Sequence, residues 1–390
     1  MKFNSDNKIL TFFLEGHIDS SNAEETEKYI NEIIEKQQFE ELVFDLDTLN
    51  YISSAGLRMI LREKKTHNSL KLINASSEVY DVLEMTGFTE MLTVEKAYRK
   101  LSIDNCEVIG QGANGKVYRL DNDTIIKVYF NHDALPDIHR ERDLARKAFV
   151  LGIPTAIPYD VVKVGDLYGS VFELLNAKSF SKLIVGEPEN KDKYIGLYTD
   201  LLKKIHSTEV KPTDMPDMKA VSLEWARFVK DYLPDADYEK LVSMIEAVPD
   251  DNHMIHGDYH IKNVMMQNGE VLLIDMDTLC HGNPVFEFAS IFNAYVGFNE
   301  LDKSVTKEFM GVDCNLAEEI WNKTLRLYFN TEDEKTLESY INKARIIGYT
   351  RLLRRTIKRV GIKDSDGKKM IEHYRKNLIN LLAKEDSLAY

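Results

Sequence analysis

The stretch that most limits what this chain can be runs from residue 256 to residue 277 and reads HGDYHIKNVMMQNGEVLLIDMD. Its Asn-Gly pair is a turn signal, and the apolar run after it predicts a β-strand that ends at Asp275. A second carboxylate, Asp258, and an amide, Asn263, precede the turn. Carboxylate and amide oxygens suit Mg²⁺ and do not suit Zn²⁺. The segment therefore predicts a magnesium site at Asn263 and Asp275, with Asp258 able to orient a hydroxyl and take its proton.

A glycine run lies upstream at residues 110–118, GQGANGKVY. Its G-x-G-x-x-G-x-V spacing opens two different devices, the strand-to-helix turn that binds dinucleotides and the hairpin that covers phosphates in kinases. Directly after the third glycine come two β-rich runs, KVYRL and TIIKVYF, with a DND turn between them. The glycines therefore join strand to strand, which favours the hairpin. A P-loop is excluded, because no G-K-[ST] follows.

Two charged residues complete the predicted phosphate site. Lys127 lies in the second of those strands, where its cation can compensate phosphate charge. Such a lysine needs an anion to hold it. Glu141 lies on the predicted helix IHRERDLARKAFVLGIP and is the best candidate for that partner.

The order of these features carries a family resemblance. His256, Asp258 and Asn263 read H-x-D-x-x-x-x-N, the spacing of the protein-kinase catalytic loop, but Gly257 replaces the Arg of those kinases and IDMD replaces DFG. No A-P-E follows, and HGNPVFEFASI stands there instead. Residues 105–390 thus resemble the aminoglycoside and choline kinase-like phosphotransferases, whose motifs are H-G-D-x-H-x-x-N, I-D-[WFL]-[DE] and G-D-P-x-x-D-L-A. The resemblance implies an α+β bilobal, protein-kinase-like domain with a β-rich N-lobe and a helical C-lobe.

The resemblance also implies roles for single residues. Asp258 is the catalytic base, Asn263 and Asp275 bind Mg²⁺, and Asp277 assists metal or substrate. The residues expected at ATP are Gly110, Gly112, Gly115, Val117, Lys127, Glu141, Glu173 and Leu175. Glu173 and Leu175 bound the predicted hinge, where backbone groups would read the purine. Asn283 and Glu287 depart from the Asp residues of the third motif, and we expect them to be structural.

The first hundred residues follow another pattern. Apolar β-rich runs at 8–16, 41–46 and 70–75 alternate with capped amphipathic segments, which predicts an α/β layered domain. KAYRKLSIDN at 96–105 is a plausible short linker. The predicted domains are 1–100, then 101–175 for the N-lobe and 176–390 for the C-lobe.

Ser54 lies at a strand-to-helix junction, in FDLDTLNYISSAGLRMIL. Its hydroxyl can cap the helix, or the same place can hold a phosphate, because free amides and the helix dipole favour an anion. With LEGHID and LKLINASSEVYDVLEMTGF, residues 1–100 resemble a STAS domain, the fold of bacterial anti-sigma factor antagonists. In that family the loop usually reads D-S-[ST]-G-L and its first Ser is phosphorylated. Ser54 aligns with that Ser, whereas Ser53 and Ala55 replace its neighbours. The resemblance implies a partner-binding module.

Composition limits the partners. The 390 residues carry 50 Lys and Arg against 64 Asp and Glu, a formal net charge of −14, so binding to nucleic acid or to an anionic membrane is not expected. No membrane span and no secretory signal is expected, and three scattered cysteines fit a reducing, cytoplasmic location. The basic run RLLRRTIKR at 351–359 is expected to be a solvated helix face.

Three functions stay open at this point. The first is an ATP- and Mg²⁺-dependent phosphotransferase that phosphorylates a small alcohol of the aminoglycoside, choline or sugar kind, with the STAS-like domain as a regulatory or partner-binding module. The second is a kinase whose acceptor is a protein, such as Ser54 of its own or a partner's STAS domain. The third is a nucleotide-sensing regulator without catalysis.

Overall fold

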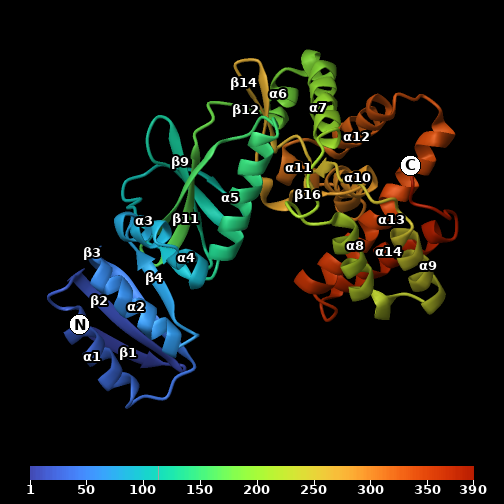
Figure 1. Cartoon of the computed structure of the whole chain (residues 1–390). Helices are drawn as coiled ribbons and strands as arrows, with labels where there is room; N and C mark the ends of the chain where they lie inside the picture. The colour runs from blue at the N-terminus through green and yellow to red at the C-terminus, as the bar shows by residue number, and fades with distance from the viewer. Residues whose placement is uncertain (113) are drawn as a thin grey trace. The chain divides into compact units, whose positions relative to one another are not determined.

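The computed structural model describes residues 1–112 and 114–390, so Ala113 of the glycine run lies outside the described residues. Contacts within the chain divide it into two compact units. Unit 1 comprises Met1–Ser102 with Val162–Gly165, and unit 2 comprises Ile103–Val161 with Asp166–Tyr390. Figure 1 follows the chain through both. Each unit is built around a hydrophobic core of its own.

Unit 1 is an α/β layered domain with a five-stranded sheet in the order β1-β2-β3-β4-β5. β1 and β2 are antiparallel, and the pairs β2–β3, β3–β4 and β4–β5 are parallel. The strands are β1 (Lys2–Asp6), β2 (Ile9–Ile18), β3 (Glu41–Ile52), β4 (Lys71–Ala75) and β5 (Val94–Lys96), with the short β6 (Arg99–Lys100) after them. The helices are α1 (Ala23–Ile34), α2 (Ser54–Thr66), α3 (Ser77–Met85) and α4 (Phe88–Met91). The predicted alternation of strands and helices is confirmed.

Two strands of unit 1 differ from the prediction. The sequence pattern does not reveal β1, because all five of its residues are exposed and it has no buried alternation to read. β3 continues past residue 46, because Leu49 and Ile52 are also buried in the core. In the same core, the ring of Phe12 on β2 packs edge to face against the ring of Phe44 on β3, with ring centroids 6.0 Å apart. The longer β3 therefore carries the chain to the start of α2.

Unit 2 begins with a β-rich lobe, whose strands lie in the order β10-β11-β9-β8-β7. They are β7 (Val108–Gln111), β8 (Gly115–Arg119), β9 (Thr124–Tyr129), β10 (Pro158–Val164) and β11 (Leu167–Glu173), with α5 (Leu135–Val150) between β9 and β10 in the chain. The last three residues of β10 are those that the division of the chain counts with unit 1. β7 pairs with β8, β8 with β9 and β9 with β11, all antiparallel. The glycine run therefore joins two strands of a hairpin. This confirms the strand-to-strand interpretation and excludes the dinucleotide-binding turn.

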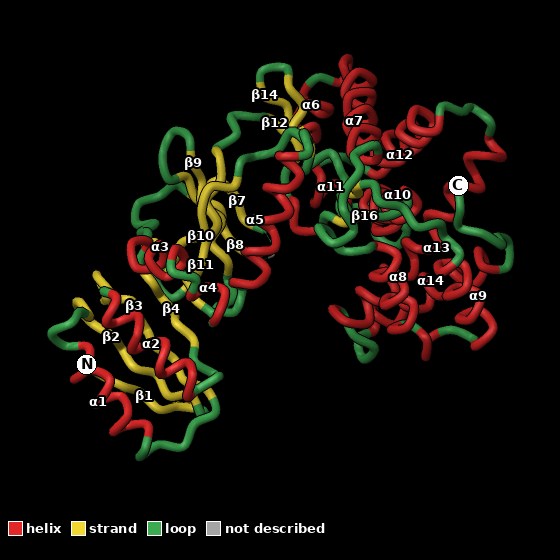
Figure 2. Tube along the Cα trace, in the orientation of Figure 1, coloured by secondary structure: helices red, strands yellow, loops and turns green. Residues whose placement is uncertain are grey.

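The rest of unit 2 is mainly helical, as the red segments of Figure 2 show. Two small sheets remain, β12 (Lys178–Ser179) with β14 (Val264–Gln267) and β15 (Glu270–Leu273), and β13 (Met254–Ile255) with β16 (Cys280–His281). The α-helices are α6 (Phe180–Gly186), α7 (Lys191–His206), α8 (Met218–Phe228), α9 (Asp235–Glu246), α10 (Pro284–Tyr295), α11 (Val305–Met310), α12 (Cys314–Phe329), α13 (Glu334–Arg359) and α14 (Ser365–Leu382). The short 3-10 turns are η1 (Pro188–Asn190), η2 (Lys230–Tyr232), η3 (Met276–Thr278) and η4 (Gly297–Asn299). A β-rich lobe followed by a helical one is the predicted architecture.

Helix α10 lies at the centre of the helical lobe. Its residues from Val285 to Tyr295 are all buried, and it packs against α12 and α13. A helix that is buried on every side belongs to the middle of a core rather than to its surface. Any side chain that α10 presents to a neighbouring loop is therefore held rigidly.

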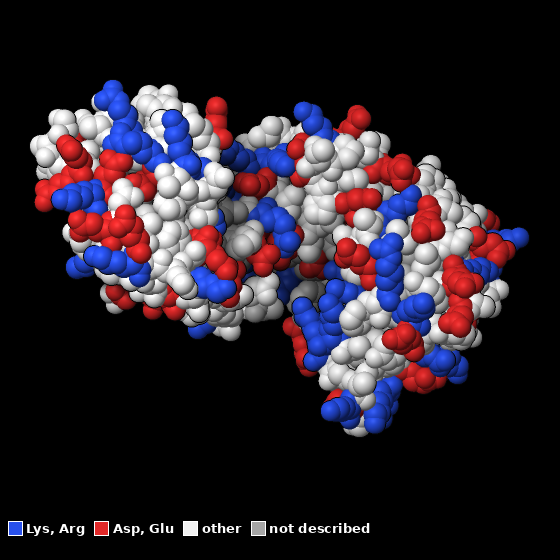
Figure 3. Space-filling model, turned by 60° about the horizontal axis from the view of Figure 1, so that its bottom comes forward, with Lys and Arg blue, Asp and Glu red and all other residues white. Residues whose placement is uncertain are grey.

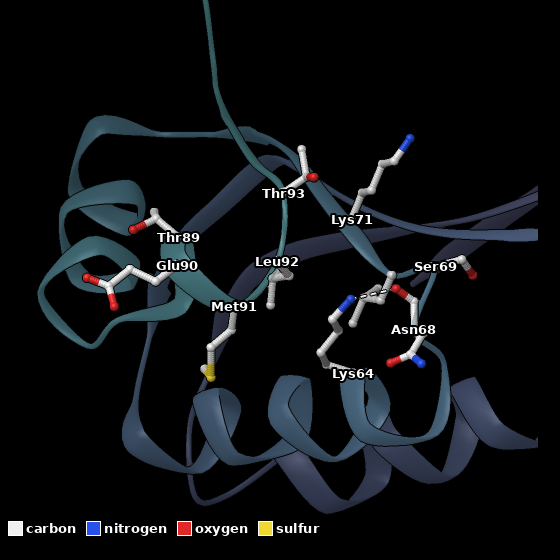
Figure 4. Close-up of a pocket in the computed structure, with 10 residues that line it drawn as sticks. Lys64, Asn68, Ser69, Lys71, Thr89, Glu90, Met91, Leu92 and Thr93 are labelled. Atoms are coloured by element: carbon white, nitrogen blue, oxygen red, sulfur yellow. Dashed lines mark hydrogen bonds between the residues drawn. The ribbon is translucent and has the colours of Figure 1, made fainter.

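The described surface includes a hollow of appreciable size on unit 1. It has a volume of about 400 Å³ and lies on unit 1 between α2, β4 and α4, where the ammonium of Lys64 donates to the carbonyl of Asn68 (Figure 4). A second hollow, of about 390 Å³, lies along α12. None of the residues predicted to bind nucleotide or metal lines either one. The candidate site has to be found from side-chain chemistry instead.

Charge and hydropathy at the surface are unremarkable on the large scale. Acidic and basic side chains are mixed over the face drawn in Figure 3. None of the helices in the described part of the chain combines the length and the apolar character needed to cross a bilayer.

The buried Glu63 of α2 gives a testable property of unit 1. Its side chain accepts a hydrogen bond from Asn31 Nδ2 at 3.2 Å, and burial raises its pKa above the ordinary value of 4.5. The stabilisation that this group contributes is present at low pH and is lost as the pH rises through the folded-state pKa. We expect Glu63→Gln, which keeps the accepting oxygen and removes the charge, to raise the unfolding temperature of unit 1 at pH 8 and to change it little at pH 4.

Calorimetric melts of the full chain at the two pH values measure this effect. Glu24→Gln, at an exposed glutamate of α1, is the matched control and should change neither midpoint. An equal shift at both pH values for Glu63→Gln would contradict the prediction.

Candidate active site

The loop between β13 and β14 contains the predicted catalytic residues, and its backbone is held from two sides. Glu287 of α10 accepts hydrogen bonds from the backbone N–H groups of His256 and of Gly257, the latter at 3.0 Å. Ser290 of the same helix donates its hydroxyl to the Gly257 carbonyl at 2.7 Å. From η3, Thr278 donates to the His256 carbonyl, also at 2.7 Å. The position of Asp258, the next residue, is thereby fixed by the core of the lobe.

Asp258 keeps 40% of its side chain exposed, while its Oδ2 lies 3.5 Å from Nε2 of the buried His260. Partial burial acts to raise the pKa of Asp258. The hydrogen bond and electrostatic attraction from His260, together with Arg351 and His256, outweigh burial and hold that pKa well below its usual range. Asp258 is therefore ionised at neutral pH and ready to accept a hydrogen bond from a hydroxyl.

Asn263 closes the same loop. Its Nδ2 donates to the carbonyl of Asp258 at 3.1 Å, so the amide orientation is set by the loop itself. Because the nitrogen is used in this way, the oxygen Oδ1 is the atom left for an external ligand. The predicted pairing of Asp258 and Asn263 in one loop is what the structure contains.

Lys127 brings three distant parts of unit 2 together. Its Nζ on β9 lies 2.9 Å from both carboxylate oxygens of Glu141 on α5, and 3.7 Å from Oδ1 of Asp275, which follows β15. Tyr129 donates its hydroxyl to Glu141 at 2.5 Å and thereby fixes the carboxylate. Burial acts to lower the pKa of Lys127, but attraction to Glu141 and Asp275 outweighs burial and raises it. The lysine is a fixed cation between two lobes.

The two aspartates after β15 differ in their surroundings. Asp275 is exposed and has a left-handed backbone, with φ +68°, which an aspartate adopts more readily than most residues. Asp277, in η3, is half-buried, and burial together with the charges of Asp275 and Glu141 raises its pKa to about 7. Negative charge is therefore in excess at this corner, even with Lys127 present.

Such an excess suits a divalent cation. Within residues 1–112 and 114–390, no cluster of three or more His, Cys, Asp or Glu side chains is arranged to hold a metal ion. Mg²⁺ does not need one, because it is commonly bound by one or two protein oxygens together with substrate phosphates and water. The amide oxygen of Asn263 and the carboxylate of Asp275 fit that requirement.

The glycines of the hairpin have unequal reasons to be glycine. A Cβ on Gly115 would lie 2.3 Å from the carbonyl oxygen of Val128, so strand packing requires glycine there. At Gly112 a Cβ would meet nothing within 4 Å, and at Gly110 its first contact would be Val117 at 3.7 Å. These two positions therefore leave open space rather than fill it, as a phosphate-covering hairpin needs. In the next ladder Val117 lies opposite Lys127.

The predicted hinge is partly used by the fold. The Glu173 N–H donates to the carbonyl of Ile157 at 3.0 Å, and the Leu174 N–H donates to the carbonyl of Asp123 at 2.7 Å. No described residue accepts a hydrogen bond from the Leu175 N–H. Neither Glu173 nor Leu175 is hydrogen-bonded to the Lys127–Glu141 pair in the described part of the chain. Of the backbone amides expected to read a purine, that of Leu175 is the one left for a ligand.

Ser54 belongs to unit 1 and is separate from these residues in the chain. The helix cap is made by Ser53, whose Oγ accepts the N–H of Ala55 at 3.1 Å. Ser54 is the first residue of α2 and its side chain is exposed. Its hydroxyl therefore does not serve as the cap.

Three residues at the site were not predicted from the sequence. His260 belongs to the H-G-D-x-H motif, but the motif does not reveal its contact with Asp258. Tyr129 belongs to no motif. Arg351 lies in the basic run that was expected to be a solvated face, and that expectation is wrong for this residue. Arg351 is half-buried, and its Nη1 donates to the Gly257 carbonyl and to Ser290 Oγ, at 3.0 Å each. No local signal could have found a contact across 94 positions of sequence.

Asn283 and Glu287 have structural contacts. Asn283 caps α10, with its Oδ1 accepting the N–H of Val285 at 3.1 Å. Glu287 is fully buried and holds the loop before Asp258. No described hydrogen bond joins Asn283 or Glu287 to Lys127, Glu141 or Asp275.

The glycine before Asp258 gives a direct test of how tightly this loop is packed. Gly257 has φ +79°, and a Cβ there would lie 2.6 Å from the Thr278 carbonyl oxygen. Gly269 has φ +86° with nothing within 4 Å, so Gly269→Ala measures the backbone cost alone, about 1–3 kcal/mol. We expect Gly257→Ala to destabilise unit 2 by more, because the Thr278 carbonyl must also move. Urea unfolding and hydrogen exchange of residues 256–263 measure the difference, and equal losses would contradict it.

Comparison with known proteins agrees with this geometry. The model of the phosphotransferase enzyme family, APH, matches residues 105–315, and the STAS domain model matches residues 1–101. A Bordetella bronchiseptica protein named "Putative anti-sigma factor antagonist BtrV" is 33% identical over 90 residues, which are 22% of this chain and 77% of that protein.

Solved structures give the same architecture. ADP-bound aminoglycoside phosphotransferase APH(2'')-Ib aligns with a TM-score of 0.51 and 15% identity, over 77% of this chain and 98% of its own. The streptomycin–ATP–APH(2'')-IIa ternary complex aligns with a TM-score of 0.50 and 15% identity, over 78% and 98% of the two chains. At 15% identity, the likeness of this chain to these two structures shows a common fold. Together with the family matches, they lead to one conclusion: the chain belongs to the phosphotransferase enzyme family and begins with a STAS domain.

Proposed function

We propose that the protein is an ATP- and Mg²⁺-dependent phosphotransferase that phosphorylates a hydroxyl group of a small molecule. The observation that carries this proposal is the meeting of Lys127 with Glu141 at 2.9 Å and with Asp275 at 3.7 Å. Asp275 is exposed and comes from a strand end far along the chain from Lys127, so the fold has no structural need to hold a cation beside it. The two fold relatives were solved with ADP and with ATP and streptomycin, which supports nucleotide use.

In this proposal each lobe contributes one half of the nucleotide site. The hairpin containing Gly110, Gly112 and Gly115 covers the phosphates, and Lys127 binds them while Glu141 holds its position. The Leu175 N–H reads the purine at the hinge between an N-lobe of residues 101–175 and a C-lobe of residues 176–390. Asn263 and Asp275 would hold Mg²⁺, which neutralises phosphate charge when bound.

Asp258 acts on the acceptor. Its carboxylate accepts a hydrogen bond from the acceptor hydroxyl and orients the oxygen toward the γ-phosphorus. A new oxygen–phosphorus bond forms as the bond to the ADP oxygen breaks, and the hydroxyl proton passes to Asp258. The low pKa of Asp258 makes it a weak base, which is compatible with a loose transition state in which positioning and charge compensation dominate. Asp277 lies near enough to the same charges to assist metal or substrate.

Replacement of Asp258 tests the proposal. We expect the wild-type chain to release ADP from Mg-ATP with at least one member of a panel of aminoglycosides, amino alcohols and sugars. Asp258→Asn should lower kcat by about 10²–10⁴, because the amide cannot take the proton, with little change in KM for ATP. Asp133→Asn, at an exposed carboxylate outside the site, is the matched control. Full activity of Asp258→Asn would refute the assigned role.

A second candidate function is phosphorylation of a protein, and the exposure of Ser54 is the observation that favours it. Because Ser53 makes the cap, the Ser54 hydroxyl at the first residue of α2 stays accessible, next to backbone amides that favour an anion. In this version the acceptor is Ser54 of the same chain or of a partner STAS domain, and unit 1 is the surface that docks a protein partner. The third possibility is a regulator that binds nucleotide and docks a partner without transferring phosphate. A cytoplasmic location is a prediction for all three functions.

Mass spectrometry after incubation with Mg-ATP separates these versions. If the protein is the acceptor, Ser54 gains one phosphate in the wild type and none in Ser54→Ala or Asp258→Asn. Ser21→Ala, which removes another exposed hydroxyl of unit 1, should leave the modification intact. An unmodified Ser54 in a preparation that turns over ATP with a small alcohol would exclude the protein acceptor.

A further inference from the structure

The C-terminal half of α13 has a basic face that begins at the catalytic loop. Arg351, Arg354, Arg355 and Lys358 are spaced i, i+3, i+4 and i+7, so they share one side of the helix. Arg351 donates to the carbonyl of Gly257, the residue before Asp258, at 3.0 Å. Since the helix rises about 1.5 Å per residue, Arg354 and Arg355 start about one turn further from that loop. We call these four residues the basic face.

Aromatic rings hold the basic face in place. The guanidinium of Arg351 lies 5.3 Å from the ring centre of Trp225, and that of Arg354 lies 5.7 Å from the ring of Phe228, both on α8. Lys358 also stacks on Phe228, at 5.1 Å. On the other flank Arg355 lies 4.9 Å from the ring of Phe298 in η4. Stacking orients each cation without neutralising it.

No carboxylate lies within ion-pairing distance of the basic face in the described part of the chain, although Arg351 attracts Asp258 at longer range. In the described part of the chain, none of the four forms an ion pair within 4.0 Å, whereas Arg345, two turns earlier on the same helix, pairs with Glu300 at 3.2 Å. Burial, followed by repulsion from Arg359 and Arg351, lowers the pKa of Arg355. A protein whose net charge is −14 thus keeps three half-buried arginines, Arg351, Arg354 and Arg355, and the exposed Lys358 together without an ion-pair partner among the described residues. Burying like charges is costly unless an anion completes the site.

We propose that the acceptor alcohol carries a phosphate or carboxylate group, and that Arg354 and Arg355, assisted by Lys358, bind this anion while the hydroxyl lies at Asp258. This rests on the proposed function and narrows its substrate class. A guanidinium binds carboxylate and phosphate oxygens in a bidentate manner, and these two arginines follow each other directly in the helix. Arg351 is a positioning residue, because its Nη1 is used by the loop.

The same charges act against a polycationic acceptor. An aminoglycoside carries several ammonium groups, and placing them along four cations that form no ion pair in the described part of the chain costs free energy. A neutral alcohol would leave the basic face without a partner. The preferred acceptor is therefore a hydroxylated compound of small size with an anion about one helical turn from the reacting oxygen, such as a phosphorylated or carboxylated sugar or polyol.

Paired acceptors test this in the full-length protein with Mg-ATP. Each pair differs only in the anion: a hexose against its monophosphate, and a polyol against the corresponding hydroxy acid. We expect kcat/KM for ADP release to be at least about tenfold higher with one anionic member, with the sugar phosphate and the hydroxy acid distinguishing phosphate from carboxylate as the preferred group. Higher kcat/KM with an aminoglycoside or with the neutral members would overturn the proposal.

Single substitutions assign the effect to residues. Arg354→Gln and Arg355→Gln should each raise KM for the anionic acceptor about tenfold and leave KM for ATP unchanged, while Arg→Lys at the same positions should restore part of the loss. Lys335→Gln, at the exposed start of α13, is the control and should alter neither constant. An unchanged acceptor KM in both Gln variants, with normal melting curves, would overturn the proposal.

A binding measurement separates failure of this inference from failure of the proposed function. Calorimetry with a hexose monophosphate in the absence of ATP needs no turnover. Binding that is weakened in Arg354→Gln and Arg355→Gln supports the anion site even if no acceptor yields ADP. Equal binding by the wild type and both variants, or no binding together with ADP release on neutral alcohols, refutes the anion site and leaves the phosphotransferase proposal standing.

Discussion

The buried carboxylate of Glu287 is the contact on which the candidate site depends. It has no solvent exposure, and it accepts hydrogen bonds from the backbone N–H groups of His256 and Gly257. A charge at that depth is tolerated only when its oxygens are hydrogen-bonded, so the loop and the helix hold each other in place. Because α10 is buried on all sides, the anchor cannot relax toward solvent. This arrangement fixes the positions of Asp258 and Asn263, which follow in the same loop.

The Lys127 corner has the opposite character. Its ion pair with Glu141 is partly buried, and such pairs add little to stability, since the cost of removing water from the charges cancels much of their attraction. What the pair supplies is position: Tyr129 and Glu141 hold one ammonium near Asp275. The surplus of negative charge at Asp275 and Asp277 then defines where a divalent cation and phosphates would be favourable.

Local charge can differ from the charge of the whole chain. The net charge of −14 argues against binding a polyanion over a broad surface, and Figure 3 shows acidic and basic side chains interspersed. Yet the second half of α13 gathers cations stacked on aromatic rings beside the catalytic loop. The anion site proposed there needs only a few charges within hydrogen-bonding reach, where screening by salt is weak. The STAS domain has an exposed serine, Ser54, at the start of α2.

Much of the fold and part of the site follow from the sequence alone, because their signals are local. Strand and helix periods predict the α/β unit, and the β-rich runs flanking the DND turn predict the hairpin that holds Gly115. The spacing from Asp258 to Asn263 and the strand that ends at Asp275 are likewise written in consecutive residues. The sequence pattern does not predict the exposed strand β1, because this strand has no buried face. At the start of α2, two adjacent serines could both cap, and only backbone geometry assigns the cap to Ser53. The contacts of Glu287 with Gly257, of Lys127 with Asp275 and of Arg351 with the catalytic loop were decided by tertiary structure, because they join residues that only the packing of lobes and helices brings within a few ångströms.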